Sequence, residues 1–265
     1  WSCSKIDGYK IMCGIVGIYR KKEPVCGDLY DALIQVQHRG QDAAGISTLD
    51  AEKISSHKEI GLVTEVFKHQ DTFENLSGNI GIGHVRYPTA GGDNVNEAQP
   101  FFTENPVNIT LAHNGTLTNS EKLKEDLIKI NFCQFNTNSD SEVLLKQFCY
   151  ELYKTNFRTL TKAHVYKALK SVFQKCSGGY AVVMIIAGIG LIAFRDPKGI
   201  RPLSLGKNKD SFLIASESSA ISAMGCLIST PESVITIKSS ESTTSIILTI
   251  FIVCHRTYFS IIPIF

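Results

Sequence analysis

The sequence predicts an α+β protein in which two sheets are faced by helices. Apolar segments with the two-residue alternation of strands stand in both halves of the chain, and a block of segments with helical spacing lies between them. Of the 265 residues, 43% are hydrophobic, which is sufficient for one sizeable core. No internal repeat and no linker-like segment is visible, so we expect the residues before Gly225 to form a single domain.

The expected elements follow from this periodicity. Ile15 begins the first strand, and Asp28 is the expected N-cap of the first helix, whose apolar stripe ends at Val36. Further strands are expected over residues 43–48, 80–87, 107–112, 180–187, 191–195 and 212–216. Further helices are expected over residues 64–67, 118–130, 139–152, 165–173 and 217–224.

Two of the later helices begin with a capping-box pattern. Thr118 is followed by Glu121, and Ser139 is followed by Glu142. Asp140 lies in the first turn of the second of these helices. Its carboxylate has two interpretations: it compensates the dipole at the helix start, or it receives an ammonium group.

The charge pattern limits the partners that this chain is expected to bind. The formal net charge is +2, and basic and acidic residues are interleaved. A broad cationic face, which nucleic acids and anionic membranes require, is therefore not expected. We expect a small-molecule partner, no nucleic acid and no membrane.

The cysteines and the chain ends indicate a cytoplasmic protein. Eight cysteines are scattered without a C-x-x-C pair or histidines at zinc spacing, which favours reduced thiols over a disulfide or metal scaffold. Residues 1–11 lack the apolar core of a signal peptide. Residues 243–265 are apolar, but His255 and Arg256 leave an uncharged stretch shorter than the roughly 20 residues of a membrane-spanning helix.

Cys13 is the candidate around which the remaining motifs are arranged. It stands between Met12 and Gly14, directly before the first strand. An α-amine has a pKa of roughly 8, so a cysteine that is the first residue carries its own base and can become a thiolate nucleophile. Gly14 would let a substrate approach the main chain closely. The alternative is a buried structural cysteine at a strand start.

Two routes would make Cys13 the first residue. The printed chain begins at Trp1. Either this numbering starts upstream of an initiator at Met12, or residues 1–12 are a leader that is removed. Both routes are left open.

Two loops at strand ends carry further candidates. Arg39 and Gly40 precede one strand, and Arg86 and Thr89 lie where another strand ends. A guanidinium in such a place is suited to bidentate binding of a carboxylate, although a surface ion pair is the alternative for Arg86. His84, on the same strand, is interpreted as a hydrogen-bonded core histidine rather than a catalyst.

The Asn114-Gly115 pair follows the strand expected over residues 107–112. An Asn-Gly pair is typical of a tight turn. It also brings together a side-chain amide and a main-chain N–H, the two donors that an oxyanion hole requires. Both interpretations are kept.

Five of these segments carry a resemblance when they are taken together. They are MCGIVG at 12–17, HRGQDAAG at 38–45, GHVRYPTAG at 83–91, HNG at 113–115 and SDSE at 139–142. The combination resembles the class II glutamine amidotransferases. Within that class, residues 39–45, 86–91 and 196–203 resemble the amidotransferases that act on phosphoribosylpyrophosphate and open purine synthesis.

The resemblance implies a fold and a catalytic group. The fold would be a four-layer αββα sandwich of the N-terminal-nucleophile hydrolase type. Cys13 would attack the carboxamide of glutamine, with its own amine as the base. Asn114 and Gly115 would hold the tetrahedral oxyanion.

The resemblance also implies the residues that bind the substrate. Arg86, helped by Thr89, would bind the α-carboxylate of glutamine, and Asp140 would bind its α-ammonium. Arg39 and Gly40 would line the pocket and take part in closing it. The products would be glutamate and ammonia.

The expected organisation has three parts. Residues 1–12 are a leader or upstream residues, residues 13–224 a glutaminase domain, and residues 225–265 a divergent apolar tail without a family pattern. The phosphoribosyltransferase domain, to which Mg²⁺ would belong, is not recognised, so we expect no cofactor. L-Glutamine is the expected ligand, and a homo-oligomer is left open. Two alternatives remain: a glutaminase domain of another class II amidotransferase, sugar-phosphate or asparagine-forming, or an inactive truncated remnant.

Overall fold

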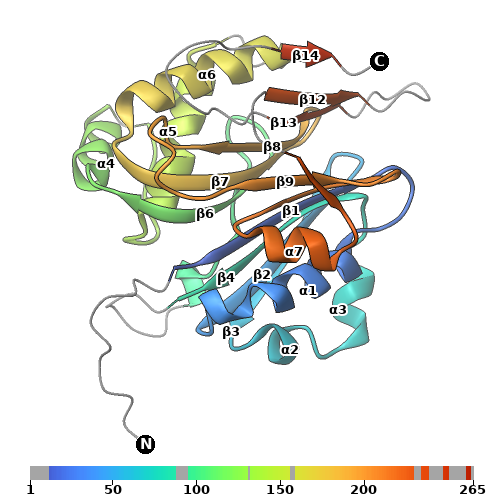
Figure 1. Ribbon diagram of the computed structural model, residues 1–265. Coiled ribbons are helices and arrows are strands. Elements are labelled where there is room, and N and C mark those ends of the chain that lie inside the picture. The colour runs from blue at the N-terminus through green and yellow to red at the C-terminus, as the bar shows by residue number, and fades with distance from the viewer. Residues whose placement is uncertain are drawn as a thin grey trace, which may run out of the picture.

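A computed structural model describes residues 12–87, 95–130, 132–155, 159–229, 234–238, 247–250 and 261–263. Two sheets pack face to face, and helices cover the outer face of each, which gives four layers (Figure 1). The expected α+β fold with an αββα layering is confirmed. Both sheets contribute to the candidate site, so their registers decide which residues meet there.

The strand that directly follows Cys13 lies at the centre of the larger sheet. Among the described residues this sheet has the strand order β11-β9-β10-β1-β4-β2-β3, and its neighbours all pair antiparallel. Its strands are β1 (Gly14–Arg20), β2 (Ala43–Asp50), β3 (Lys53–Ile60), β4 (Ile80–Arg86), β9 (Ser204–Lys207), β10 (Ser211–Ala215) and β11 (Leu227–Ser229). Helices α1 (Cys26–Gln35), α2 (Val63–Val66), α3 (Gln70–Asn75) and α7 (Ser218–Ala223) lie on its outer side (Figure 1).

The second sheet has the order β5-β6-β7-β8 and is also antiparallel. Its strands are β5 (Phe101–Thr103), β6 (Ile109–Leu117), β7 (Gly178–Ile186) and β8 (Gly190–Arg195). Helices α4 (Ser120–Lys129), α5 (Asp140–Tyr153) and α6 (Lys162–Lys175) cover it (Figure 1). The short 3₁₀ helices are η1 (Gln37–Arg39) and η2 (Val95–Glu97), and a further sheet contains β12 (Val234–Lys238), β13 (Ile247–Ile250) and β14 (Ile261–Pro263).

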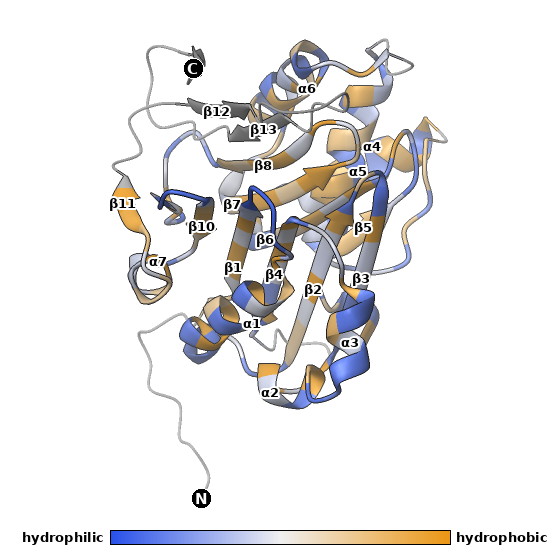
Figure 2. Cartoon of the chain, turned by 90° about the vertical axis from the view of Figure 1, so that its right-hand side faces the viewer, coloured by the Kyte–Doolittle hydropathy of each residue, from blue (hydrophilic) through white to orange (hydrophobic). Residues whose placement is uncertain are grey.

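Strand β1 is buried on both sides because it lies in the middle layers. Ile15 belongs to the apolar cluster between the sheets, whereas Val16 belongs to the cluster between the larger sheet and its helices. Successive strand residues face opposite sides, so this strand requires apolar residues on both faces rather than on one. Figure 2 shows hydrophobic colouring along β1 and β7, whereas helices such as α1 and α6 carry both hydrophobic and hydrophilic colouring.

Two helix starts differ from the expectation. Helix α1 starts at Cys26 with Val25 at the N-cap, so Asp28 is not the cap; its carboxylate pairs with Arg20 at 2.6 Å instead. Helix α4 has Asn119 at its N-cap without a side-chain capping bond, so the capping box predicted for residues 118 and 121 is wrong.

The helix that carries Asp140 begins as expected. Ser139 is the N-cap of α5, and its Oγ accepts a hydrogen bond from the N–H of Ser141 at 3.3 Å. Glu142 does not reach back to Ser139; its carboxylate accepts hydrogen bonds from the main-chain N–H groups of Asn136 and Thr137. The N-cap prediction is confirmed, and the reciprocal half of the capping box is wrong.

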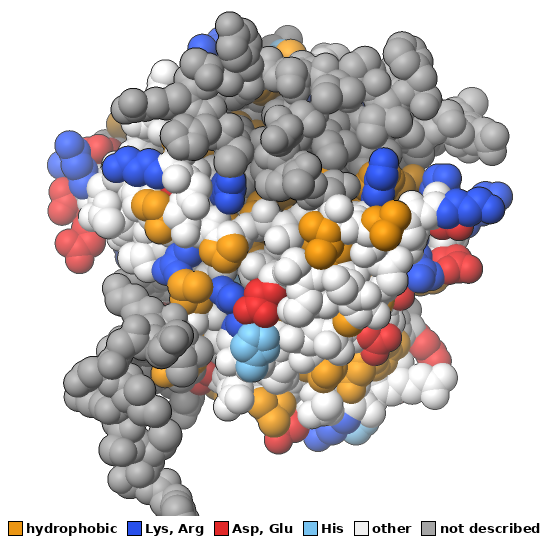
Figure 3. All heavy atoms as spheres, in the orientation of Figure 1, with side chains coloured by type: hydrophobic (Ala, Val, Ile, Leu, Met, Phe, Trp, Pro, Cys, Tyr) orange, Lys and Arg blue, Asp and Glu red, His pale blue; other side chains and the backbone are white. Residues whose placement is uncertain are grey.

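The described residues contain no helix that combines the length and the apolar composition of a bilayer-spanning segment. The face shown in Figure 3 carries scattered basic and acidic side chains without a broad basic patch.

Candidate active site

Four of the predicted site residues meet in one cavity. Cys13, Arg86, Gly115 and Asp140 line a cavity of about 350 Å³. They come from the residue before β1, the end of β4, the end of β6 and the start of α5, so the cavity takes its walls from both sheets. Residues separated by more than a hundred positions in the sequence are therefore placed around one space.

The strand registers explain this convergence. Gly14 on β1 pairs antiparallel with Val85 on β4, so Cys13 stands alongside Arg86 at the same sheet end. On the facing sheet, β6 runs through Asn114 and Gly115 instead of turning after residue 112. The tight-turn interpretation of this pair is wrong, because cross-strand pairing with β7 continues to Leu117.

The glycine of this pair is required by the strand itself. Gly115 has a φ of +152°, and an added Cβ would lie 2.2 Å from the main-chain oxygen of Gly179. No L side chain fits there. The Asn114 side chain is buried, and its Nδ2 lies 3.5 Å from Oγ of Ser216 on the larger sheet.

The environment of Cys13 keeps its thiol protonated. Burial raises the pKa of the thiol, and this effect outweighs the main-chain amide of Tyr87 and the charge of Arg86, both of which lower it. The carboxylate of Asp140 raises it further. A nucleophilic role for this thiol therefore requires a base next to it.

The buried histidines near the site do not provide that base. His84 and His113 have lowered pKa values, mainly because both are buried; the pKa of His84 falls to about 3. His84 is fully buried and is thus a core histidine, as predicted. No described contact joins either ring to the thiol of Cys13.

Arg86 is neither exposed nor part of a surface ion pair. Its side chain is 6% exposed and binds two carboxylates, Asp42 at 2.7 Å and Glu97. Burial with two acceptors holds the guanidinium in a fixed orientation at the cavity wall. Thr89, its expected helper, lies outside the described residues.

Asp140 is another residue of the cavity wall. Its Oδ2 accepts a hydrogen bond from the N–H of Leu117 at 2.8 Å, and its Oδ1 lies 3.8 Å from Nδ1 of His113. The side chain is 24% exposed, which leaves it accessible from the cavity. A carboxylate fixed in this way can receive a cationic group.

Arg39 and Gly40 were expected to line the pocket, but they are not among the residues that line this cavity. Arg39 Nε donates to the main-chain oxygen of Cys13 at 3.0 Å, and its Nη1 donates to Oε1 of Glu217 at 2.6 Å. Gly40 packs so closely on β4 that an added Cβ would lie 2.5 Å from the carbonyl carbon of Arg86. The structure thus places both residues where they support Cys13 and Arg86.

Gly14 also has a different role from the one expected. An added Cβ there would lie 2.8 Å from Val85 and 2.9 Å from Val36. The space next to Gly14 is filled by the core. The glycine is explained by packing of α1 and β4, and the expected close approach of a substrate at this point is wrong.

Several residues of the site were not predicted from the sequence. Gln99 Nε2 donates to the main-chain oxygen of His113 at 3.2 Å and to Oγ of Ser141 at 3.1 Å, and Ser141 in turn contacts His113 Nδ1 at 2.9 Å. Glu97, Ser216 and Glu217 were also missed. The fold brings these three residues into contact with the predicted ones, and no local sequence motif identifies them.

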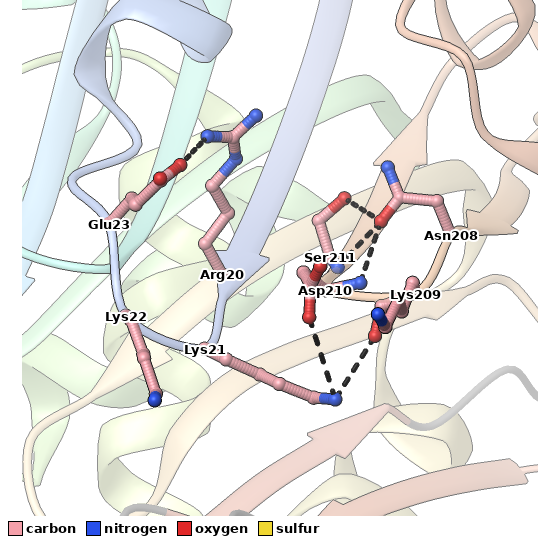
Figure 4. Close-up of a pocket in the computed structure, with 8 residues that line it drawn as sticks. All are labelled: Arg20, Lys21, Lys22, Glu23, Asn208, Lys209, Asp210 and Ser211. Carbon is pink, nitrogen blue, oxygen red and sulfur yellow. Dashed lines mark hydrogen bonds and ion pairs between the residues drawn. The ribbon is translucent and has the colours of Figure 1, made fainter.

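A second cavity lies at the other end of β1. It has a volume of about 480 Å³ and is lined by Arg20, Lys21, Lys22, Lys209 and the acidic residues Glu23 and Asp210, among others. Figure 4 shows Arg20 directed at Glu23, and Lys21 directed at residues 209 and 210. None of the predicted site residues lies there.

Two facing sheets enclosed by helices, with a cysteine at the start of a central strand and an Asn-Gly pair on the facing sheet, define the N-terminal-nucleophile class of amidotransferase folds. The chain belongs to the glutamine amidotransferase domain family, whose model matches residues 84–223.

Relatives and solved structures agree with this family. The chain is 49% identical over 218 residues to an amidophosphoribosyltransferase of Pseudomonas aeruginosa, covering 81% of this chain and 43% of that protein. It is 47% identical over 220 residues to that of Escherichia coli, with coverages of 81% and 43%. It is 44% identical over 215 residues to that of Saccharomyces cerevisiae, with coverages of 78% and 42%.

A solved glutamine phosphoribosylpyrophosphate amidotransferase from B. subtilis, complexed with ADP and GMP, superposes with a TM-score of 0.69 at 34% identity. The match covers 82% of this chain and 44% of that one. The chain therefore spans less than half the length of these relatives.

Proposed function

We propose that this chain hydrolyses glutamine to glutamate and ammonia, with Cys13 as the nucleophile and as the first residue of the mature polypeptide. The observation that carries the proposal is the single cavity lined by Cys13, Arg86, Gly115 and Asp140. It places a thiol, an oxyanion donor, a guanidinium and a carboxylate around one space, which matches the groups of a glutamine molecule.

The charged groups orient the substrate. Arg86 binds the α-carboxylate of glutamine, aided by Thr89, and Asp140 binds the α-ammonium. The guanidinium fork is already fixed by Asp42 and Glu97, so little side-chain entropy is lost on binding. The γ-carboxamide then points to the thiol of Cys13.

The reaction proceeds in two steps on the thiol. The α-amine of Cys13 takes the thiol proton while the sulfur attacks the carbonyl carbon of the side-chain carboxamide, and the same proton passes to the departing NH₂ group, which leaves as ammonia. Water then attacks the γ-glutamyl thioester and releases glutamate. Asn114 Nδ2 and the N–H of Gly115 stabilise the oxyanion of each tetrahedral intermediate, and the loss of one such donor costs about 10²–10³ in rate.

The raised pKa of the Cys13 thiol supports an amine as the base. The thiol stays protonated near neutral pH because its pKa is raised, and no described hydrogen bond joins a histidine to it. An α-amine, with a pKa of roughly 8, is partly neutral at that pH and lies on the same residue. This base exists only if the peptide bond to Met12 is absent.

The wider role of the chain is inferred from the activity after which its relatives are named. As residues 13–224 of a cytoplasmic amidophosphoribosyltransferase, the glutaminase domain would supply ammonia for the first step of purine synthesis. The 41–49% identity to eight relatives that bear this name supports that assignment over a sugar-phosphate or asparagine-forming enzyme.

The test combines intact mass with ammonia release. The mass of the active protein should show Cys13 as its first residue, and Cys13→Ala should lower ammonia release from glutamine by at least about 10³-fold. Cys133→Ala is the matched control, because Cys133 is another free, partly exposed cysteine. Persistent turnover in Cys13→Ala, or an active protein that retains residues 1–12, would remove the proposed nucleophile.

A further inference from the structure

One buried hydroxyl connects the strand of the nucleophile with the facing sheet. Ser216, the residue after β10, is 1% exposed. Its Oγ accepts a hydrogen bond from the N–H of Ile15 at 2.9 Å, and its own N–H donates to the oxygen of Ile15 at 3.0 Å. These two bonds fix the main chain two residues beyond Cys13.

The same oxygen lies 3.5 Å from Nδ2 of Asn114. A side-chain amide carries two N–H donors, so one can point at Ser216 while the other stays available for an oxyanion. The last torsion of an asparagine is broad, and nothing intrinsic decides which way the amide faces. The buried Oγ of Ser216 is a fixed acceptor and can therefore decide the orientation of the amide.

We propose that Ser216 is a positioning residue, which holds the Asn114 amide in register with Cys13 so that its second N–H faces the developing oxyanion. The inference rests on the proposed glutaminase function. It implies that Ser216 affects stabilisation of the oxyanion and not binding of glutamine, because Arg86 and Asp140 bind the glutamine ground state without it.

Ser216→Ala should lower kcat for ammonia release by about 10- to 100-fold, less than the loss of an oxyanion donor itself, and leave KM for glutamine within about twofold. Ser211→Ala is the matched control. Ser211 is the first residue of β10, at the opposite end of the strand from Ser216, and its buried hydroxyl donates to Asn208 at 2.9 Å. An unchanged kcat in Ser216→Ala, or an equal loss in Ser211→Ala, would overturn the proposal.

A double-mutant cycle tests whether Ser216 acts through Asn114. The double variant Ser216→Ala with Asn114→Ala should have a kcat within about twofold of Asn114→Ala alone, since the amide to be positioned is already gone. If the two losses multiply instead, Ser216 acts by another route and the inference is wrong.

A measurement without turnover separates this inference from the proposed function. In ¹⁵N-labelled protein, the side-chain amide resonances of Asn114, assigned by their loss in Asn114→Ala, should shift in Ser216→Ala and stay in place in Ser211→Ala. Unshifted resonances in Ser216→Ala would overturn the positioning role, whether or not the protein releases ammonia. Absence of ammonia release from the wild type would instead contradict the proposed function.

Discussion

The guanidinium of Arg39 holds the main-chain oxygen of Cys13, with Nε donating at 3.0 Å. The bond fixes the carbonyl side of Cys13 and leaves its nitrogen free of this contact. Arg39 is itself held by Glu217, which also lies 3.1 Å from His38. Glu217, the residue immediately after Ser216, thus supports the main chain of Cys13 through Arg39.

Replacement of Glu217 should weaken this support. In Glu217→Gln the buried guanidinium of Arg39 loses its carboxylate, and we expect a loss of about 1–3 kcal/mol in the free energy of unfolding together with a lower kcat. Urea unfolding and ammonia release measure the two effects. Glu125→Gln, which alters an exposed pair with Lys129 on α4, should change neither. Wild-type behaviour of Glu217→Gln would show that Arg39 holds its position without this carboxylate.

Arg86→Lys should raise KM for glutamine at least about tenfold, with a smaller effect on kcat. A lysine is a single point charge and cannot bind Asp42, Glu97 and a substrate carboxylate in one plane. Arg20→Lys is the control, because Arg20 also binds two carboxylates but at the far end of β1. Steady-state kinetics decide the point, and an unchanged KM would assign Arg86 to structure alone.

Gly40→Ala should destabilise the protein by about 1–3 kcal/mol and reduce activity. The new methyl group would lie 2.5–2.6 Å from the carbonyl group of Arg86, which is main chain and cannot rotate away. Gly27→Ala provides the contrast: it lies in α1 with nothing within 4 Å of the added Cβ, and there alanine should be neutral or slightly stabilising. Equal melting temperatures for the two variants would contradict this packing argument.

Acid should remove the stabilisation that Glu151 provides. Burial alone would raise the pKa of its carboxyl, but hydrogen bonds to Lys154 and Lys175 outweigh burial, and the pKa lies below its ordinary value of 4.5. The unfolded chain therefore binds the proton more readily, so the stabilisation is complete above pH 4.5 and is lost as the pH falls through the lower folded-state pKa.

The corresponding measurement compares melting temperatures of wild type and Glu151→Gln across pH. The difference should be largest near pH 7 and shrink toward pH 3. A difference that stays constant over this range would show that the ion pairs of Glu151 contribute nothing that depends on its charge.

Much of the fold was predictable because its strands are apolar and alternate. Strands β1, β4, β7 and β8 appear close to their expected bounds. Strand β3 was missed, since its sequence KISSHKEI is mostly polar, as suits an edge strand that faces solvent. The turn predicted at Asn114 was wrong because pairing with β7 overrides the local preference of an Asn-Gly pair.

Only those site residues that lie in recognisable sequence motifs could be predicted. Cys13, Arg86, Gly115 and Asp140 lie in short recognisable segments and meet as expected. Gln99, Ser216 and Glu217 contribute hydrogen bonds across 14 to 201 positions of sequence, and such contacts leave no periodic signal. Sequence reasoning thus found the groups proposed for chemistry and missed those that hold them.

The walls of the cavity come from two separate sheets, so its geometry depends on how the two sheets are aligned with each other. A slide of one sheet over the other by a single residue would carry the thiol away from the Asn-Gly pair while leaving each sheet internally intact. Heat inactivation should therefore coincide with the earliest loosening between the sheets, ahead of any melting of secondary structure.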